Sequence, residues 1–245
     1  MRRAYALPEA GGVPTLTPVQ TSAPTDLEVR RAPRPRWTSV LLPVVVGLAL
    51  GPVDLLLQHV LPYPFANLAN SPAVWALVAF AVGWHDRIRG WWWPAVAGTL
   101  ALLLAVEGYY ATAVLTLGDD PSTLTNSAAV LWLGLAVAAG VVFGTAGSWA
   151  SSAHRWRGPV GTALAVTVLL TEAWLNLSRV AGAAGDAAYR QDLVQTALVL
   201  LVLAVAAAIL AGRSARQRVV GSAVALPLAL VGALALGALN ALGLV

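Results

Sequence analysis

Cysteine and lysine are both absent from this chain of 245 residues. Without cysteine the protein has no disulfide framework, no thiolate nucleophile and no cysteine metal site. Without lysine no Schiff base can form, which excludes a retinal protein, although the sequence contains seven long apolar segments. All fifteen basic residues are therefore arginine.

Charged residues are also scarce, at 11% of the chain, whereas 58% of the residues are hydrophobic. Such a chain is too apolar for a soluble domain and is typical of a polytopic membrane protein. The net charge of +4 does not indicate nucleic-acid binding, because the arginines fall in short clusters between apolar runs. We expect anionic lipid headgroups to be their partners.

The apolar segments follow an N-terminal region of different composition. Residues 1–37 are rich in Pro, Ala, Thr and Arg and lack apolar periodicity, which predicts a disordered cytoplasmic tail. Residues 38–245 are predicted to form an all-α transmembrane bundle whose segments lie near the roughly 20 residues that a bilayer requires. The expected spans are 38–60, 66–84, 91–114, 127–149, 158–179, 192–211 and 219–243. The second is the weakest, because its strongest apolar core, Pro72–Trp84, is short.

Arginine is distributed unequally between the two sets of connecting segments. Eleven arginines near span ends fall on one side, and only Arg179 and Arg190 fall on the other. The positive-inside rule then places the N-terminus in the cytoplasm and, with seven spans, the C-terminus outside. We expect a multi-pass protein of the cell inner (plasma) membrane.

A weak repeat is present within the spans. Pro94 precedes Glu107 by thirteen residues, and Pro159 precedes Glu172 by the same interval. The residues 70–75 (NSPAVW) also resemble residues 126–132 (NSAAVLW). We interpret the chain as three related hairpins, made of spans 1–2, 3–4 and 5–6, followed by one further helix. Chance similarity in an apolar sequence is the alternative explanation.

Three carboxylates carry the candidate chemistry. The outgoing helix of each hairpin contains one of them late in its span: Asp54, Glu107 and Glu172. Each lies about 14–16 residues, or roughly 21–24 Å, from the expected cytoplasmic end. An ionisable group inside a membrane is costly and marks a candidate functional site. We therefore expect the three carboxylates to surround one outward-facing site.

Polar and aromatic residues accompany these carboxylates at helical spacing, about one turn farther along. The expected ligand-binding residues are Asp54, Glu107, Glu172, Tyr109, Tyr110, Trp174, Gln58 and Asn176. Gly47 and Gly51 lie on the stripe of Asp54, which indicates that a neighbouring helix packs closely there. The pair Gly140 and Gly144 indicates close packing on the fourth span in the same way.

These features favour a protein that binds or transports a small cationic or protonatable solute, because ionised carboxylates attract cations and aromatic faces hold organic ones. The first alternative is an intramembrane enzyme acting on a lipid or isoprenoid, with Glu107 or Glu172 as a general acid in an aromatic cavity, by analogy with small seven-span terpene cyclases. The second is a non-catalytic membrane partner subunit with structural carboxylates. No cofactor or metal site is predicted, since His59 has no second histidine in range.

Two stretches resemble an uncharacterised family of actinobacterial polytopic membrane proteins, known as a domain of unknown function. They are Leu68–Gly83 (LANSPAVWALVAFAVG) and Glu107–Tyr110 (EGYY). The resemblance implies a helical membrane fold for the region after the tail. It implies no activity, because the family has none assigned, and it supplies no catalytic or binding residues.

Overall fold

The computed structural model describes residues 37–183 and 185–241. The described helices pack as one compact unit. The helices are α1 (Trp37–Val60), α2 (Phe65–Ala69), α3 (Pro72–Trp84), α4 (Trp93–Leu117), the 3₁₀ helix η1 (Pro121–Leu124), α5 (Ser127–Ala150), α6 (Arg157–Arg179), α7 (Ala187–Ala211) and α8 (Ala215–Ala241). The expected disordered tail lies outside the described residues, apart from Trp37.

Six of these helices, α1 and α4 to α8, are long and apolar enough to cross a membrane. The described residues form no strand. The expected all-α bundle is therefore confirmed, and the chain is a multi-pass membrane protein by the length and composition of its helices.

The second expected span, 66–84, is not one helix. It is broken into α2 and α3, and α3 has only 13 residues. The break occurs because Pro72 disfavours helical dihedrals at the preceding residue, and Ser71 is indeed extended, with φ −88° and ψ 118°. The Ser71 hydroxyl accepts a hydrogen bond from the Val74 N–H at 3.2 Å, which caps the new helix.

Close contacts between small residues set the direction of α1. Gly47 lies against Ala101, and Gly51 lies against Ala105, so α1 and α4 run parallel. A side chain at Gly51 would collide with the backbone of α4. The expected close approach of a neighbouring helix to this stripe is therefore confirmed.

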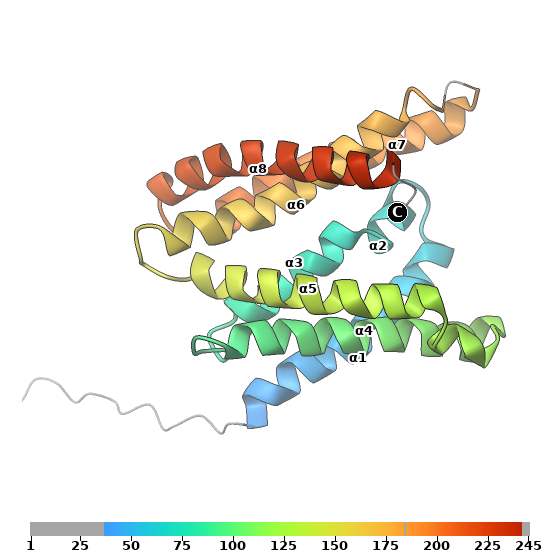
Figure 1. Cartoon of the computed structure of the whole chain (residues 1–245), viewed down its shortest axis with the longest axis horizontal. Helices are drawn as coiled ribbons and strands as arrows, with labels where there is room; N and C mark the ends of the chain where they lie inside the picture. Colours follow the sequence, from blue (N-terminus) through green and yellow to red (C-terminus); the bar gives the residue numbers. More distant parts are fainter. Residues whose placement is uncertain (1–36, 184, 242–245) are drawn as a thin grey trace, which may run out of the picture. The chain divides into compact units, whose positions relative to one another are not determined.

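In chain order the short helix α3 comes between these two parallel helices and carries the chain back. Ala79 clusters with Leu102, and Val82 clusters with Ala97, so α3 runs antiparallel to α4. In Figure 1, α3 lies in the middle of the bundle, and it contacts α4, α5 and α6. The pair α2–α3 thus takes the place of the second pass.

The C-terminal helices pack around α6, which contacts α5, α7 and α8. Gly221 of α8 lies against Pro159 and Thr162, and Gly232 lies against Thr171, so α8 runs parallel to α6. Of the three expected hairpins, α4–α5 and α6–α7 pack as such. The first does not, because α1 packs chiefly on α4 while its return helix α3 packs on α4, α5 and α6.

Candidate functional site at the α2–α3 break

Glu172 of α6 binds the first turn of α3. Its Oε2 accepts a hydrogen bond from the Ala73 N–H at 2.7 Å, and the Ser71 hydroxyl lies close to the carboxylate. The N-terminus of a helix carries partial positive charge and unsatisfied N–H groups, so a carboxylate is a favourable partner there. Glu172 therefore stabilises a helix start that lies inside the bundle.

Two further hydrogen bonds hold the surroundings of this break. The Asn67 amide of α2 donates to the Thr196 hydroxyl of α7 at 2.9 Å, and Thr196 is almost fully buried. The Asn176 amide donates to the backbone oxygen of Glu172 at 2.9 Å, so the structure brings these two expected residues together. The break is thus braced from both α6 and α7.

Asp54 forms the second polar centre, between α1, α3 and α4. Its side chain is 4% exposed, and its Oδ2 accepts a hydrogen bond from the Gln58 amide at 2.9 Å. The Trp75 side chain of α3 also lies close to this carboxylate, and Gln58 lies close to the Tyr109 hydroxyl. Ala73 and Trp75 both lie in the first turn of α3. The Glu172 centre and the Asp54 centre therefore both contact this turn.

Three aromatic rings gather on one side of the Asp54 centre. The Trp75 and Tyr109 rings meet edge to face at 6.5 Å between centroids, and Tyr109 meets Tyr110 at 5.6 Å. The structure therefore brings together four of the expected site residues: Asp54, Gln58, Tyr109 and Tyr110.

Two expected site residues lie elsewhere. Glu107 is exposed on α4. The neighbouring residues Ala105 and Val106 are buried, so α4 packs through their faces and not through the face of Glu107. Trp174 is 56% exposed on α6. Glu107 is thus more exposed than Asp54, which is buried, and Glu172, which is half-buried, and the structure does not bring all three into one ring.

Neither Asp54, which is buried, nor Glu172, which is half-buried, has a basic partner in the part of the chain that the structure describes. No salt bridge there joins Asp54 or Glu172 to an arginine or histidine. Arg179, the nearest basic residue on the same face of α6, acts on Glu172 only through longer-range electrostatics. Within the described residues, the groups that donate hydrogen bonds to the two carboxylates are neutral: the Gln58 amide and the Ala73 N–H.

The other polar candidates have local roles. Asp120 caps η1, and hydrogen bonds from the backbone and side chain of Ser122 hold the pKa of its carboxyl below the ordinary value. The His59 ring bonds the backbone oxygen of Leu55 at 2.8 Å. Among residues 37–183 and 185–241, no three His, Asp or Glu side chains gather closely enough to hold a metal ion.

Three participants were not among the expected site residues: Trp75, Ser71 and the Ala73 N–H. The signal that could have revealed them was the sequence Asn70-Ser71-Pro72, which predicts a helix start within an apolar segment. A helix that starts inside the membrane needs a partner for its free N–H groups, and a carboxylate elsewhere in the bundle is a suitable one.

Comparison with known families gives one match. Residues 30–242 match the model described as "Family of unknown function (DUF6518)". The chain belongs to this family. No curated protein and no solved structure matches it significantly. The family covers all six long helices and the α2–α3 break, so the site is part of the family's own domain.

Proposed function

We propose that this DUF6518 protein binds and transports a small cationic or protonatable solute at the α2–α3 break, with Asp54 and Glu172 as its charged groups. One observation carries the proposal: two carboxylates surround an interrupted helix inside the bundle, and neither is paired with a basic residue of the described chain. A proton or an organic cation would supply the missing positive charge.

The energetics support this assignment. An Asp at the centre of a membrane span costs roughly 2.5–3.5 kcal/mol on insertion scales. Neutral donors such as Gln58 and the Ala73 N–H reduce that cost, but they leave the negative charge in place. A chain that gained only stability from these positions would do so more readily with apolar side chains.

The interrupted helix supports transport in particular. Discontinuous helices form the substrate sites of many transporters, and this part of the argument is an analogy of architecture. The direct link is physical: a hydrogen bond to an ionised carboxylate is roughly twice as strong as a neutral one. A proton or cation that neutralises Glu172 would therefore weaken its bond to Ala73 and loosen the start of α3.

The arginine distribution supports a location in the plasma membrane with the N-terminus in the cytoplasm and the C-terminus outside. In that orientation α6 runs outward, so Glu172 lies toward the outer end of its helix. Solute would reach the break from the outer face, and anionic lipid headgroups would contact the arginines on the inner face.

A second candidate is an intramembrane enzyme acting on an isoprenoid or other lipid. The observation that favours it is the aromatic group of Trp75, Tyr109 and Tyr110 beside a buried acid. The acid in that setting is Asp54, whereas Glu172 contacts the backbone and a serine. A role as a partner subunit is favoured by Glu107, a carboxylate exposed on the side of a spanning helix.

Native mass spectrometry of the full chain, released from its own membrane in mild detergent, tests the proposal. The comparison is wild type against Asp54→Asn and Glu172→Gln, with Glu107→Gln as the matched control at similar depth. We expect a small basic molecule that is retained by wild type and by the control and lost from the other two variants. Its mass also separates a solute from an isoprenoid.

Two results would contradict solute binding. The first is a bound species that survives in Asp54→Asn and Glu172→Gln alike. The second is a species lost equally in Glu107→Gln, since that would make the loss a general effect of removing membrane carboxylates. A neutral isoprenoid lost only with Asp54→Asn would favour the enzyme instead.

A further inference from the structure

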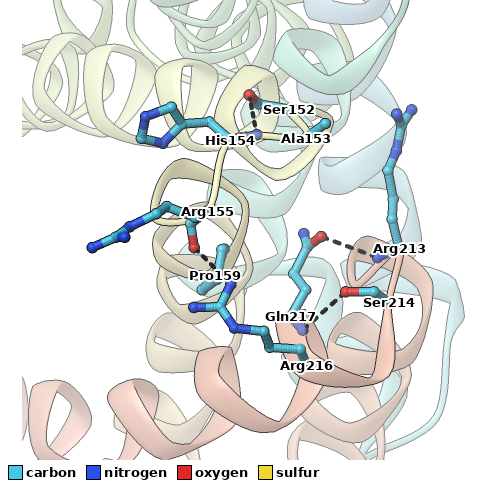
Figure 2. Close-up of a pocket in the computed structure, with 9 residues that line it drawn as sticks. All are labelled: Ser152, Ala153, His154, Arg155, Pro159, Arg213, Ser214, Arg216 and Gln217. Carbon is cyan, nitrogen blue, oxygen red and sulfur yellow. Dashed lines mark hydrogen bonds between the residues drawn. The ribbon is translucent and has the colours of Figure 1, made fainter.

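A second polar site lies at the opposite end of α6 from Glu172, where the α5–α6 and α7–α8 connections meet. These connections and the first turns of α6 and α8 line an open surface pocket of about 250 Å³, shown in Figure 2. Ligand pockets for drug-sized molecules occupy roughly 300–1,000 Å³. The pocket is therefore sized for one small chemical group.

The floor of the pocket is a buried glutamine, Gln217, which is 6% exposed. Its amide nitrogen donates to the Ala150 oxygen and the Thr162 hydroxyl, both at 3.0 Å, and to the Ala211 oxygen at 3.2 Å. Its amide oxygen accepts from the Arg213 N–H at 3.3 Å. These bonds join the ends of α5 and α7 to the starts of α6 and α8, so the pocket is fixed before any ligand binds.

Arg213 and Arg216 lie on the two sides of Gln217 (Figure 2). Arg216 is held there because its Nη1 donates to the Arg155 oxygen at 3.2 Å. The Arg155 guanidinium itself lies over the Trp156 ring, 5.2 Å from its centroid. No acidic residue lines the pocket, and within the described residues no salt bridge joins either flanking arginine to a carboxylate.

This positive charge lies at the unfavourable end of a helix. The first turn of α8 contains no acidic residue, although the partial positive charge of a helix N-terminus favours anions there and cations at the C-terminus. Arg218 avoids the conflict, because its Nε donates to the Gly212 oxygen just beyond α7, at 2.8 Å. Arg216 bonds the Arg155 oxygen, and the Arg213 side chain makes no hydrogen bond within the described residues, so both guanidinium groups leave positive charge at this helix start that a bound anion would offset.

We propose that this pocket binds a phosphate group between the guanidinium groups of Arg213 and Arg216, over the N–H groups of Ala215 and Arg216, the first two of α8. The third, that of Gln217, already donates to the Ser214 hydroxyl at 3.1 Å. Guanidinium groups match phosphate oxygens in shape and charge, and helix N-termini bind phosphate through their free N–H groups. The Ser152 hydroxyl accepts from the His154 N–H and keeps its own proton for the ligand. The phosphate belongs to an anionic lipid headgroup or to a free phosphate-bearing ion.

The test uses the full chain in nanodiscs of phosphatidylcholine with phosphatidylglycerol as the anionic component, and in detergent with inorganic phosphate. The pocket variant combines Arg213→Gln with Arg216→Gln. The matched control combines Arg87→Gln with Arg89→Gln, which removes the same charge from the exposed α3–α4 connection. Native mass spectrometry measures retained lipid, and calorimetry measures phosphate affinity.

We expect the pocket variant to weaken binding of its ligand about tenfold or more and the control to leave it unchanged. Pocket-dependent retention of phosphatidylglycerol identifies a lipid headgroup, and pocket-dependent phosphate binding without lipid retention identifies a free ion. Equal losses in the two variants, or no pocket-dependent binding of either probe, would overturn the proposal. The single variant Arg213→Gln is a check against misfolding of the double variant, because the Arg213 side chain makes no hydrogen bond in the described chain. We expect it to weaken ligand binding several-fold.

Discussion

The Oε2 atom of Glu172 accepts a hydrogen bond from the Ala73 N–H at 2.7 Å, across 99 positions of sequence. The bond joins α6 to the start of α3 in the middle of the bundle. An uncapped helix start inside a membrane leaves N–H groups that water cannot reach, which costs several kcal/mol for each such group. The carboxylate of Glu172 removes part of that cost, and the position of α3 thereby depends on the state of Glu172.

Replacing Glu172 by Ala should destabilise the fold by about 1–3 kcal/mol, because the Ala73 N–H loses its partner in a buried setting. Glu172→Gln keeps an acceptor oxygen and should cost less. Denaturant unfolding in micelles, followed by circular dichroism, measures both. Glu107→Ala is the control and should change the free energy of unfolding by less than about 0.5 kcal/mol. Equal effects of Glu172→Ala and Glu107→Ala would contradict the capping role.

Asp54→Asn should leave the protein as stable as the wild type, or more stable, within about 1 kcal/mol. The Asn side chain still offers an oxygen to Gln58, while the unpaired negative charge is gone. Thermal unfolding in micelles checks this expectation. The same variant should lose the bound solute, so stability and binding would separate. A large loss of stability would show that the ionised form of Asp54 is needed for folding.

Gly51→Ala should destabilise the α1–α4 contact by about 1–3 kcal/mol, because a Cβ there would collide with the Ala105 oxygen. Gly134 of α5 provides the matched control, since nothing lies within 4 Å of a Cβ at that position. Gly134→Ala should instead stabilise its helix by about 0.5–1 kcal/mol. Unfolding of both variants under identical conditions measures the difference. Stabilisation by Gly51→Ala as well would show that helix propensity outweighs packing at the α1–α4 contact.

The absence of cysteine makes the orientation directly testable, because any introduced thiol is unique. Ser122→Cys lies in the connection between α4 and α5, and Ala215→Cys lies at the start of α8; both positions are exposed. A membrane-impermeant maleimide added to intact cells should label the first and spare the second until the membrane is opened. The reverse pattern would invert the expected topology.

Much of the fold could be predicted from the sequence because its determinants are local. Apolar length predicts the long spanning helices, and the pattern Asn70-Ser71-Pro72 predicts a helix start. The stripe of Gly47 and Gly51 correctly predicted a close helix contact, since only small residues permit one. The second span was expected as one helix, because its apolar composition concealed the effect of Pro72 on the residue before it.

The site could be predicted only in part. Spacing along one helix places Gln58 beside Asp54, and this pair is present. Counting residues from the cytoplasmic end of each span places Glu107 at the same membrane depth as Asp54 and Glu172. This depth does not determine which face of a helix meets its neighbours. Glu107 is exposed because α4 uses its other faces for packing.

The sequence by itself determined the class of protein, the extent of the spans and the uneven arginine distribution, since these follow from composition and local chemistry. Only the tertiary structure decided that Glu172 meets Ala73, that Trp75 meets Asp54 and that Gln217 closes a pocket between two connections. Each of these contacts joins helices that are distant in sequence. Their partners depend on how the small residues of neighbouring helices pack, which no single segment specifies.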